Sequence, residues 1–235
     1  MQFTYYGHSC FALKINDKTF LFDPFIKGNE LAKHIDVNAI PADYILVSHG
    51  HFDHTADLIA IAKRTGAKII SNYEIINWAQ KQGITNLHPM NFGTANFKFG
   101  TLTYMQAQHS SSFEDGSYAG SPGGFILASE HGSFYYSGDT SLTLDMQLVS
   151  HYANVDIAIL PIGGNFTMNV KDALKASELI KCNNIIGMHF DTFGYIKIDK
   201  EESLKLFKDA GKKLLIPEIG KEYDIKNNTQ LINSH

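Results

Sequence analysis

The chain has 235 residues, of which 44% are hydrophobic and 19% charged, and its formal net charge is −4. This composition is ordinary for a globular protein, and the length suffices for one sizeable core. The acidic balance, without any run of lysine and arginine, argues against a nucleic-acid-binding surface. Arg64 is the only arginine, so the bidentate guanidinium fork that clamps phosphates and carboxylates is nearly absent.

The cysteine content and the N-terminus predict a cytoplasmic protein. Cys10 and Cys182 are too few for a disulfide framework, which fits a reduced compartment. Residues 1–6 lack the basic and apolar regions of a signal peptide. No apolar run approaches the roughly 18 residues of a membrane span, so no membrane association is expected.

The first ninety residues predict strands that alternate with short helices. The capping preferences of Asp and Gly set the expected ends of the first long helix. In chain order we expect strands over Phe3–Asp23 with a turn at Asn16-Asp17, a loop or short helix over 28–43, and a buried strand Tyr44–Ser48. A helix Leu58–Thr65 follows, with Asp57 as N-cap and Gly66 beyond its end. A strand at Ile69-Ile70 and a helix Glu74–Gln82 ended by Gly83 come next.

The rest of the chain is first strand-rich and then alternates between helices and strands. Residues 91–136 predict strands around Phe97/Phe99, Leu102/Tyr104, Phe125–Leu127 and Phe134–Tyr136. Thereafter we expect helices Leu142–Tyr152, Val170–Lys181 capped by Asn169 and Glu201–Ala210 capped by Asp199, and strands Ile157–Leu160, Ile185–Met188 and Leu214–Ile216. A strand-rich run closed by helices, occurring twice, predicts an α/β fold in which two sheets pack face to face with helices outside, as one domain over 1–235.

Six consecutive residues after the buried strand carry three imidazoles and a carboxylate: His49-Gly50-His51-Phe52-Asp53-His54. Alternate residues at a strand exit point the same way, so His49 and His51 are expected to share one metal ion. Asp53 and His54, turned by the start of the next helix, then face a second ion. The alternative, a polar loop without metal, requires this cluster of ligands to arise by chance. Such nitrogen and oxygen ligands suit zinc, manganese or iron.

Three later residues complete two ligand sets. His109, Asp139 and His189 each follow a strand-like segment, where α/β sheets present functional groups. Singly, each fits an ordinary turn or capping residue, and Asp139 also fits the start of a helix. Together with the six-residue motif they are far more specific. We expect one metal to bind His49, His51 and His109, the other to bind Asp53, His54 and His189, and Asp139 to bridge the two.

The order of these residues resembles the ligand motifs of the metallo-β-lactamase superfamily, and Asp23 matches the early aspartate of that superfamily. Further segments are similar to a smaller branch, the metal-dependent hydrolases related to L-ascorbate-6-phosphate lactonase. The resemblance implies a four-layer αβ/βα sandwich with the metals in a cleft at one edge of the two sheets. The segments similar to the branch include Tyr6–Phe11, Asp23–Phe25, Leu160–Gly164, Phe166–Met168 and His189–Phe193.

Departures from the relatives narrow the expected activity. Asp139 stands where many zinc β-lactamases have a cysteine, so antibiotic hydrolysis is not expected. The extra domains of glyoxalase II, of the β-CASP nucleases and of the diiron reductases have no room in 235 residues. The lactonase is a longer protein, so its substrate does not transfer. Asn169-Val170 replaces a Gly-Pro pair that often follows Phe166–Met168 in the branch, which changes the helix entry beside the site.

These features predict a binuclear metal-dependent hydrolase that attacks a lactone, ester or phosphoester of a small metabolite with a metal-bridging hydroxide. Asp53 is expected to bind metal and accept the water's proton. His8, in a Gly-His-Ser turn, is expected either to donate to the oxyanion or leaving group, or to support a ligand. Asp23 is expected to orient a metal-bound histidine through its ring N–H. Cys10 is expected to be a core residue.

Two metal ions are the expected cofactors, zinc first, with manganese or iron as alternatives. The expected partner is a small-molecule substrate rather than nucleic acid or membrane, and assembly into a homo-oligomer stays open. Two other functions compete: a phosphodiesterase or nuclease of the same fold, and a metal-binding protein without turnover. Aromatic side chains near the motifs are expected to line a pocket or to pack in the core: Phe25, Phe166, Phe190, Phe193 and Tyr195.

Overall fold

Alternating apolar side chains place strand β2 (Cys10–Ile15) between two cores. Phe11 and Leu13 enter a core between two sheets, whereas Cys10 and Ala12 enter a second core on the outer face of their sheet. Because successive side chains of a strand point to opposite faces, a continuous buried run marks a strand that is covered on both sides.

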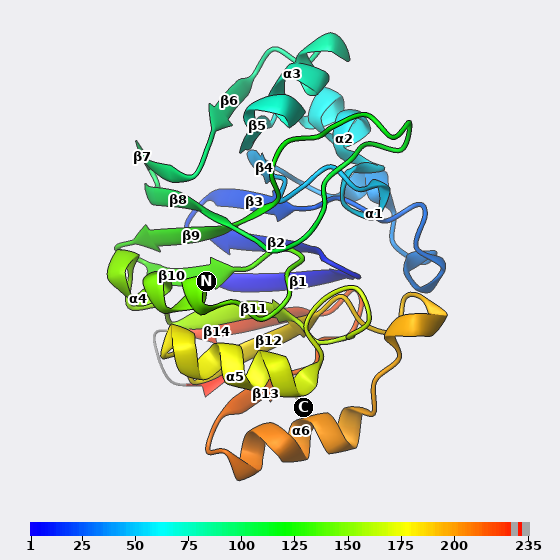
Figure 1. The fold of residues 1–235 in the computed structure, drawn as a ribbon. Coiled ribbons are helices and arrows are strands. Elements are labelled where there is room, and N and C mark those ends of the chain that lie inside the picture. Colours follow the sequence, from blue (N-terminus) through cyan, green and yellow to red (C-terminus); the bar gives the residue numbers. More distant parts are fainter. Residues whose placement is uncertain (227–229, 232–235) are drawn as a thin grey trace.

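The structure, a computed structural model, describes residues 1–226 and 230–231. It contains two sheets, one of eight strands and one of seven, with helices around them (Figure 1). The first sheet has the order β15 (Gln230–Leu231), β14 (Glu222–Lys226), β1 (Gln2–Gly7), β2, β3 (Lys18–Phe22), β4 (Tyr44–Leu46), β5 (Lys68–Asn72) and β6 (Leu87–Met90). The second has the order β13 (Lys213–Leu215), β12 (Asn184–Met188), β11 (Ile157–Pro161), β10 (Gly132–Tyr136), β9 (Gly123–Ser129), β8 (Gly100–Gln106) and β7 (Gly93–Phe97).

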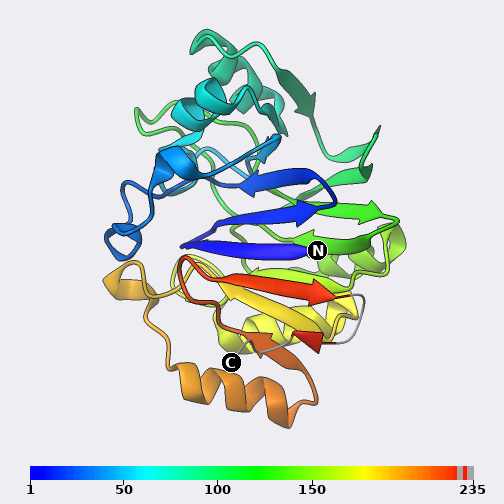
Figure 2. The ribbon, with the colours of Figure 1, turned by 180° about the vertical axis from the view of Figure 1, so that it is seen from behind.

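Helices cover the outer faces, which gives the four layers that the sequence predicts. The helices are α1 (Phe52–Thr55), α2 (Leu58–Thr65), α3 (Tyr73–Lys81), α4 (Val149–Tyr152), α5 (Val170–Ile180) and α6 (Lys200–Asp209). Apolar residues of α2 and α3 form the outer core of the first sheet, and those of α5 pack on the second sheet. Figure 2 shows the same layers from behind, with the first sheet nearer the viewer. The α/β sandwich is therefore confirmed.

Parallel pairing brings several strand exits to one edge of the sandwich. In the first sheet β3, β4 and β5 are parallel neighbours, and in the second β10, β11 and β12 are. The carboxyl ends of parallel neighbours lie side by side, where ligands bind in many α/β proteins. Asp23, His49, Asp139 and His189 all follow the ends of these strands.

Two local expectations were wrong. The segment 142–152 is not one helix but a 3-10 turn, η3 (Leu144–Leu148), followed by the single turn α4. Only Met146 and Val149 of these two elements are buried, which is too narrow an apolar stripe to stabilise a long helix. Asp57 stands before α2, but its carboxylate does not cap that helix; it accepts the N–H groups of Ile26 and Lys27 at 2.7 and 2.9 Å.

Among the residues that the structure describes, no helix is both long and apolar enough to cross a membrane.

Candidate metal centre

The first ligand group consists of His49, His51 and His109, and their ligand atoms lie within 4.8 Å of one another. His49 and His51 follow β4, whereas His109 comes from the loop after β8. The Nε2 atom of His49 lies 3.0 Å from Nδ1 of His51. Two imidazole nitrogens this close either share a proton or present their lone pairs to one cation.

Neighbouring hydroxyls can hold both ring protons away from the shared space. The Ser48 hydroxyl donates to Asp23 at 2.5 Å, so it accepts from His49 Nδ1 at 2.9 Å. On the far side, Ser110 Oγ lies 3.3 Å from His51 Nε2 and can accept a proton from it. When His51 carries its proton on Nε2, both ring protons point outward, and the lone pairs of His49 Nε2 and His51 Nδ1 converge, as imidazoles do around a metal ion.

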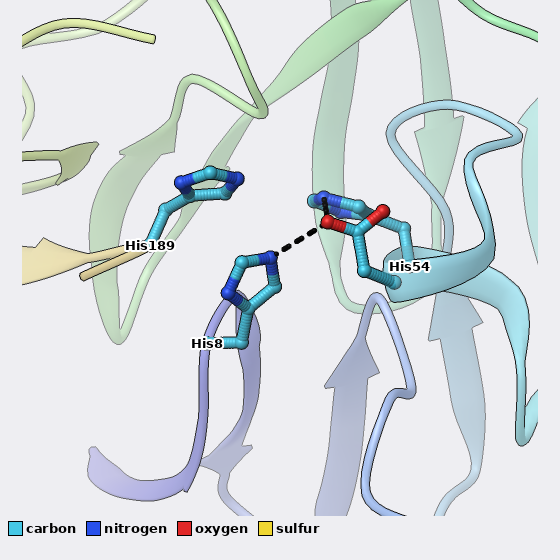
Figure 3. Close-up of side chains that lie close together, drawn as sticks. His8, His54 and His189 are labelled. Carbon is cyan, nitrogen blue, oxygen red and sulfur yellow. Dashed lines mark hydrogen bonds and ion pairs between the residues drawn. The ribbon is translucent and has the colours of Figure 1, made fainter. Parts of the chain in front are cut away.

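The second group consists of His8, Asp53, His54 and His189, again with ligand atoms within 4.8 Å of one another. Figure 3 shows His8, His54 and His189 pointing toward a common space from three different elements. His54 comes from α1, His8 from the turn between β1 and β2, and His189 from the end of β12. The structure therefore adds His8 to the group that the sequence predicts.

Asp139 lies between the two groups. Its Oδ2 is 2.9 Å from His189 Nε2 and 3.3 Å from His54 Nε2 in the second group, and 3.8 Å from His109 Nε2 in the first. The carboxylate is 2% exposed, and its Oδ1 has no hydrogen-bond partner among the described residues. His54 Nε2 and His189 Nδ1 are likewise buried without such a partner. Polar atoms left unpaired in a buried cluster fit a site that metal ions complete.

Asp23 supports the centre through hydrogen bonds to His54 and Ser48. Its Oδ2 accepts a hydrogen bond from His54 Nδ1 at 2.8 Å, and its Oδ1 accepts the backbone N–H of Ser48 at 2.7 Å. The hydroxyl of Tyr136 also donates to Oδ2. Because Nδ1 of His54 donates to Asp23, Nε2 is the nitrogen that faces the centre and would bind a cation there. The position of Asp23 fits the expected orienting role.

The charges of the cluster are mutually dependent. Burial alone would lower the pKa of His54, but the carboxylates of Asp139 and Asp23 raise it well above its usual range. Burial and the charge of His54 hold the pKa of His49 well below that range. Burial would raise the pKa of Asp139, yet His189 and His54 hold it well below normal. The negative charge of the carboxylates favours a protonated His54. The same charge favours a divalent cation in place of that proton.

His8 is a neutral imidazole wedged between Asp53 and Thr192. Burial, aided by His189, lowers the pKa of His8 to about 4. Nε2 lies 2.9 Å from Asp53 Oδ2, and Nδ1 lies 3.0 Å from Thr192 Oγ1. A carboxylate can only accept, so Nε2 carries the proton, and Nδ1 faces the Thr192 hydroxyl, which also lies 3.3 Å from the Phe190 carbonyl. The backbone of His8 is in the left-handed region, with φ of 56°, and its carbonyl accepts the N–H of His189 at 2.8 Å.

The loop after β8 closes one side of the centre through Gly50. The Gly50 N–H donates to Ser111 Oγ at 3.1 Å, and Ser111 donates to the carbonyl of Ala119. A Cβ at position 50 would lie 2.2 Å from the Cβ of Ala119, so only glycine permits this approach. The loop and the six-residue motif therefore pack as one unit.

All the residues that the sequence predicts at the centre lie together: His8, His49, His51, Asp53, His54, His109, Asp139 and His189. Their roles as ligands stay a prediction. Four supporting residues were not predicted: Ser48 and Ser110 contact His49 and His51, Thr192 contacts His8, and Tyr136 contacts Asp23. Ser48 is marked in the sequence only by its position next to His49, and Thr192 only by the His189–Phe193 segment. Of the expected aromatics, Phe25 and Phe190 are buried, whereas Phe166, Phe193 and Tyr195 are exposed. Cys10 is fully buried, as expected.

Comparisons with known proteins agree with this geometry. The family model of the beta-lactamase superfamily domain matches residues 2–189. A UPF0173 metal-dependent hydrolase of Christiangramia forsetii is 51% identical over 227 residues, which is 96% of this chain and 100% of that protein. One of Methylacidiphilum infernorum is 52% identical over 210 residues, covering 89% of this chain and 93% of that protein.

A solved structure has the same architecture. Igni18, described as a novel metallo hydrolase from the hyperthermophilic archaeon Ignicoccus hospitalis, superposes with a TM-score of 0.85 at 30% identity, covering 96% of this chain and 99% of that one. The relation to L-ascorbate-6-phosphate lactonase stays a prediction. The chain belongs to the β-lactamase superfamily and is one of its metal-dependent hydrolases, with the metallo-β-lactamase fold.

Proposed function

We propose that the protein hydrolyses an ester or lactone bond of a small metabolite at a centre of two divalent cations. The observation that carries this proposal is the position of Asp139, whose one oxygen reaches histidines of both ligand groups. His49, His51 and His109 would hold one cation, and Asp53, His54 and His189 the other, with Asp139 shared. Zinc is the first candidate because imidazole dominates the donor set, with manganese and iron as alternatives.

When bound, the two cations would supply a bridging hydroxide near neutral pH and polarise the scissile carbonyl. Among the protein's own residues, Asp53 would transfer the proton. Asp53 is partly open, with its side chain 25% exposed, so it can accept the proton of the attacking water and return it to the leaving group. Burial would raise the pKa of Asp53, but His54 and His8 more than offset this and keep it a carboxylate.

A large polyanionic substrate fits this chain poorly. The guanidinium of Arg64 donates to the carbonyls of Val37 and Ile40. The only side chain able to clamp a phosphate in bidentate fashion is therefore engaged in a loop. This favours carboxylic esters and lactones over phosphodiesters or nucleic acid.

Metal analysis combined with a substrate panel tests the function. Protein purified without chelator and reconstituted with zinc or manganese should contain about two metal ions per chain. It should hydrolyse members of a panel of esters and lactones more readily than phosphodiesters, and dialysis against chelator should abolish turnover. Failure to bind metal after reconstitution would remove the basis of the proposal, and two bound metals without any turnover would point to a binder.

The contact between His8 and Asp53 leads to a separate prediction. We propose that His8 orients the Asp53 carboxylate, so His8→Asn should lower kcat roughly 10–100-fold, the usual effect of losing a partner of a metal ligand. Asparagine tolerates the left-handed backbone at this position, which separates the lost contact from backbone strain. Thr192→Val, which removes only the hydroxyl on Nδ1, should cause a smaller loss.

Metal content and the pH dependence of kcat are the readouts for both variants. We expect retained metal and, in His8→Asn, a shifted acidic limb of the pH profile, because Asp53 loses its hydrogen-bond donor. Wild-type turnover in His8→Asn would exclude any positioning role for His8.

A further inference from the structure

An aromatic groove lies beside the candidate metal centre. It has a volume of about 510 Å³, within the range of small-molecule sites. We call it the Trp78 groove. It is lined by Phe52, Thr55, Ala56, Ile59, Trp78, Phe113, Glu114 and Asp115.

The groove and the centre share one wall, helix α1. Phe52 lies in the chain between His51 and Asp53, so a molecule touching its ring is one residue away from two candidate ligands. The hydroxyl of Thr55, also in the groove, donates to the His51 carbonyl at 3.0 Å. Helix α1 therefore carries residues of both the groove and the centre.

The floor of the groove is apolar and preformed. The rings of Trp78 and Phe113 stack with centroids 4.7 Å apart. Phe113 is fixed by a tight turn, since its N–H donates to the Ser117 carbonyl and its own carbonyl accepts from Gly116, both at 2.9 Å. Phe52, by contrast, is 46% exposed and leaves a large apolar surface to be covered.

The rim of the groove is negatively charged. Glu114 and Asp115 are exposed, and neither lysine nor arginine is among the described residues that line the groove. Hydrogen bonds from the Ser117 hydroxyl and backbone N–H hold the pKa of Asp115 below its usual range. An anionic group at the outer end of a bound arm would therefore be repelled, whereas an ammonium group would be attracted.

We propose that the Trp78 groove binds the apolar, aryl or alkyl arm of the substrate, and that it selects arms ending in a neutral or cationic group over arms ending in a carboxylate. The role of the arm as part of a substrate rests on the proposed hydrolytic function. Binding of the arm itself does not, and it is therefore measured separately.

Trp78 is the only tryptophan of the chain, so its fluorescence reports occupation of the groove directly. The metal-loaded protein is titrated at pH 7 with three probes of one shape: 2-phenylethylamine, 2-phenylethanol and phenylacetate. We expect the amine to bind about three- to tenfold more tightly than the carboxylate, a modest ratio because exposed charges are screened. The double variant Glu114→Gln/Asp115→Asn should remove this preference for the amine over the carboxylate.

A groove-filling variant and a matched control complete the test. Ala56→Phe places a ring in the groove from an exposed helix end and should abolish the fluorescence response. Tyr118→Ala removes an exposed aromatic of the same loop that does not line the groove and should leave the response unchanged. With an active enzyme, Ala56→Phe should raise KM for 2-phenylethyl esters while methyl esters are unaffected.

The outcomes separate the two proposals. Saturable binding that Ala56→Phe abolishes supports the groove even if no ester is hydrolysed, in which case only the proposed function fails. A protein that hydrolyses esters but gives no Trp78 response to any probe overturns the groove proposal alone. Equal affinity for amine and carboxylate overturns the proposed selection by charge.

Discussion

Asp139→Ala is expected to reduce the metal content of both ligand groups, whereas His189→Ala should empty mainly one. The physical reason is the position of the Asp139 carboxylate, which lies within 3.8 Å of ring nitrogens from both groups. Loss of a residue that only supports a metal ligand usually lowers metal affinity or activity about 10–100-fold. Loss of a ligand shared by two metals should therefore lower kcat/KM by more than about 100-fold. Metal analysis after reconstitution, together with turnover, measures both effects.

A second variant separates lost charge from lost shape. Asp139→Asn keeps the volume of the buried side chain but removes the negative charge that lies beside His189 and His54. It should resemble Asp139→Ala in metal content while folding normally. Retention of about two metals per chain in either variant would contradict the bridging role.

The clustering of the candidate ligands could be predicted because strand exits converge. His49 and His51 alternate after a buried strand, and Asp139 and His189 end apolar segments that become parallel strands, so the topology brings them to one edge. Two hydrogen bonds that support the centre were not predictable from the sequence. The hydrogen bond between His8 and Thr192 spans 184 positions, and that between Tyr136 and Asp23 spans 113.

The two local errors have different origins: the segment 142–152 lacks the apolar stripe of a long helix, and Asp57 binds other partners. Asp57 has the residue type and position of an N-cap, but the unpaired N–H groups of Ile26 and Lys27 compete for its carboxylate. The groove could not be predicted from the sequence, because no motif includes Trp78 or Phe113. Trp78 and Phe113 lie 35 positions apart and are brought together only by the packing of the loop against α3.

Asp23→Asn should disable the centre without replacing any ligand. The Asp23 carboxylate accepts hydrogen bonds from the Ser48 backbone, the Ser48 and Tyr136 hydroxyls and the His54 ring. An asparagine side chain has one acceptor oxygen. This oxygen must face the Ser48 backbone N–H, because a backbone N–H can only donate a hydrogen bond. Its amide N–H groups then face the hydroxyls, which can turn, and Nδ1 of His54.

His54 can satisfy that amide only by moving its proton from Nδ1 to Nε2. The nitrogen that faces the metal would then carry a hydrogen and no lone pair, so the second cation could not bind it. In a serine protease triad the equivalent change, a wrong histidine tautomer, costs about 10⁴ in kcat. We expect a loss of at least about 100-fold here, with the metal of the second group lost first.

Stability and ring tautomer provide independent readouts. The free energy of unfolding of the metal-free variant should fall by about 1–3 kcal/mol, the cost of an unsatisfied buried donor. Asparagine accepts the backbone of position 23, whose φ is 41°, so backbone strain does not contribute. Tyr136→Phe is the matched control: it removes one donor to the same carboxylate, should cost about 1 kcal/mol and should leave the metal content intact. Nitrogen NMR of the His54 ring distinguishes the two tautomers, and a protonated Nδ1 in an active, fully metallated Asp23→Asn variant would refute the orienting role of Asp23.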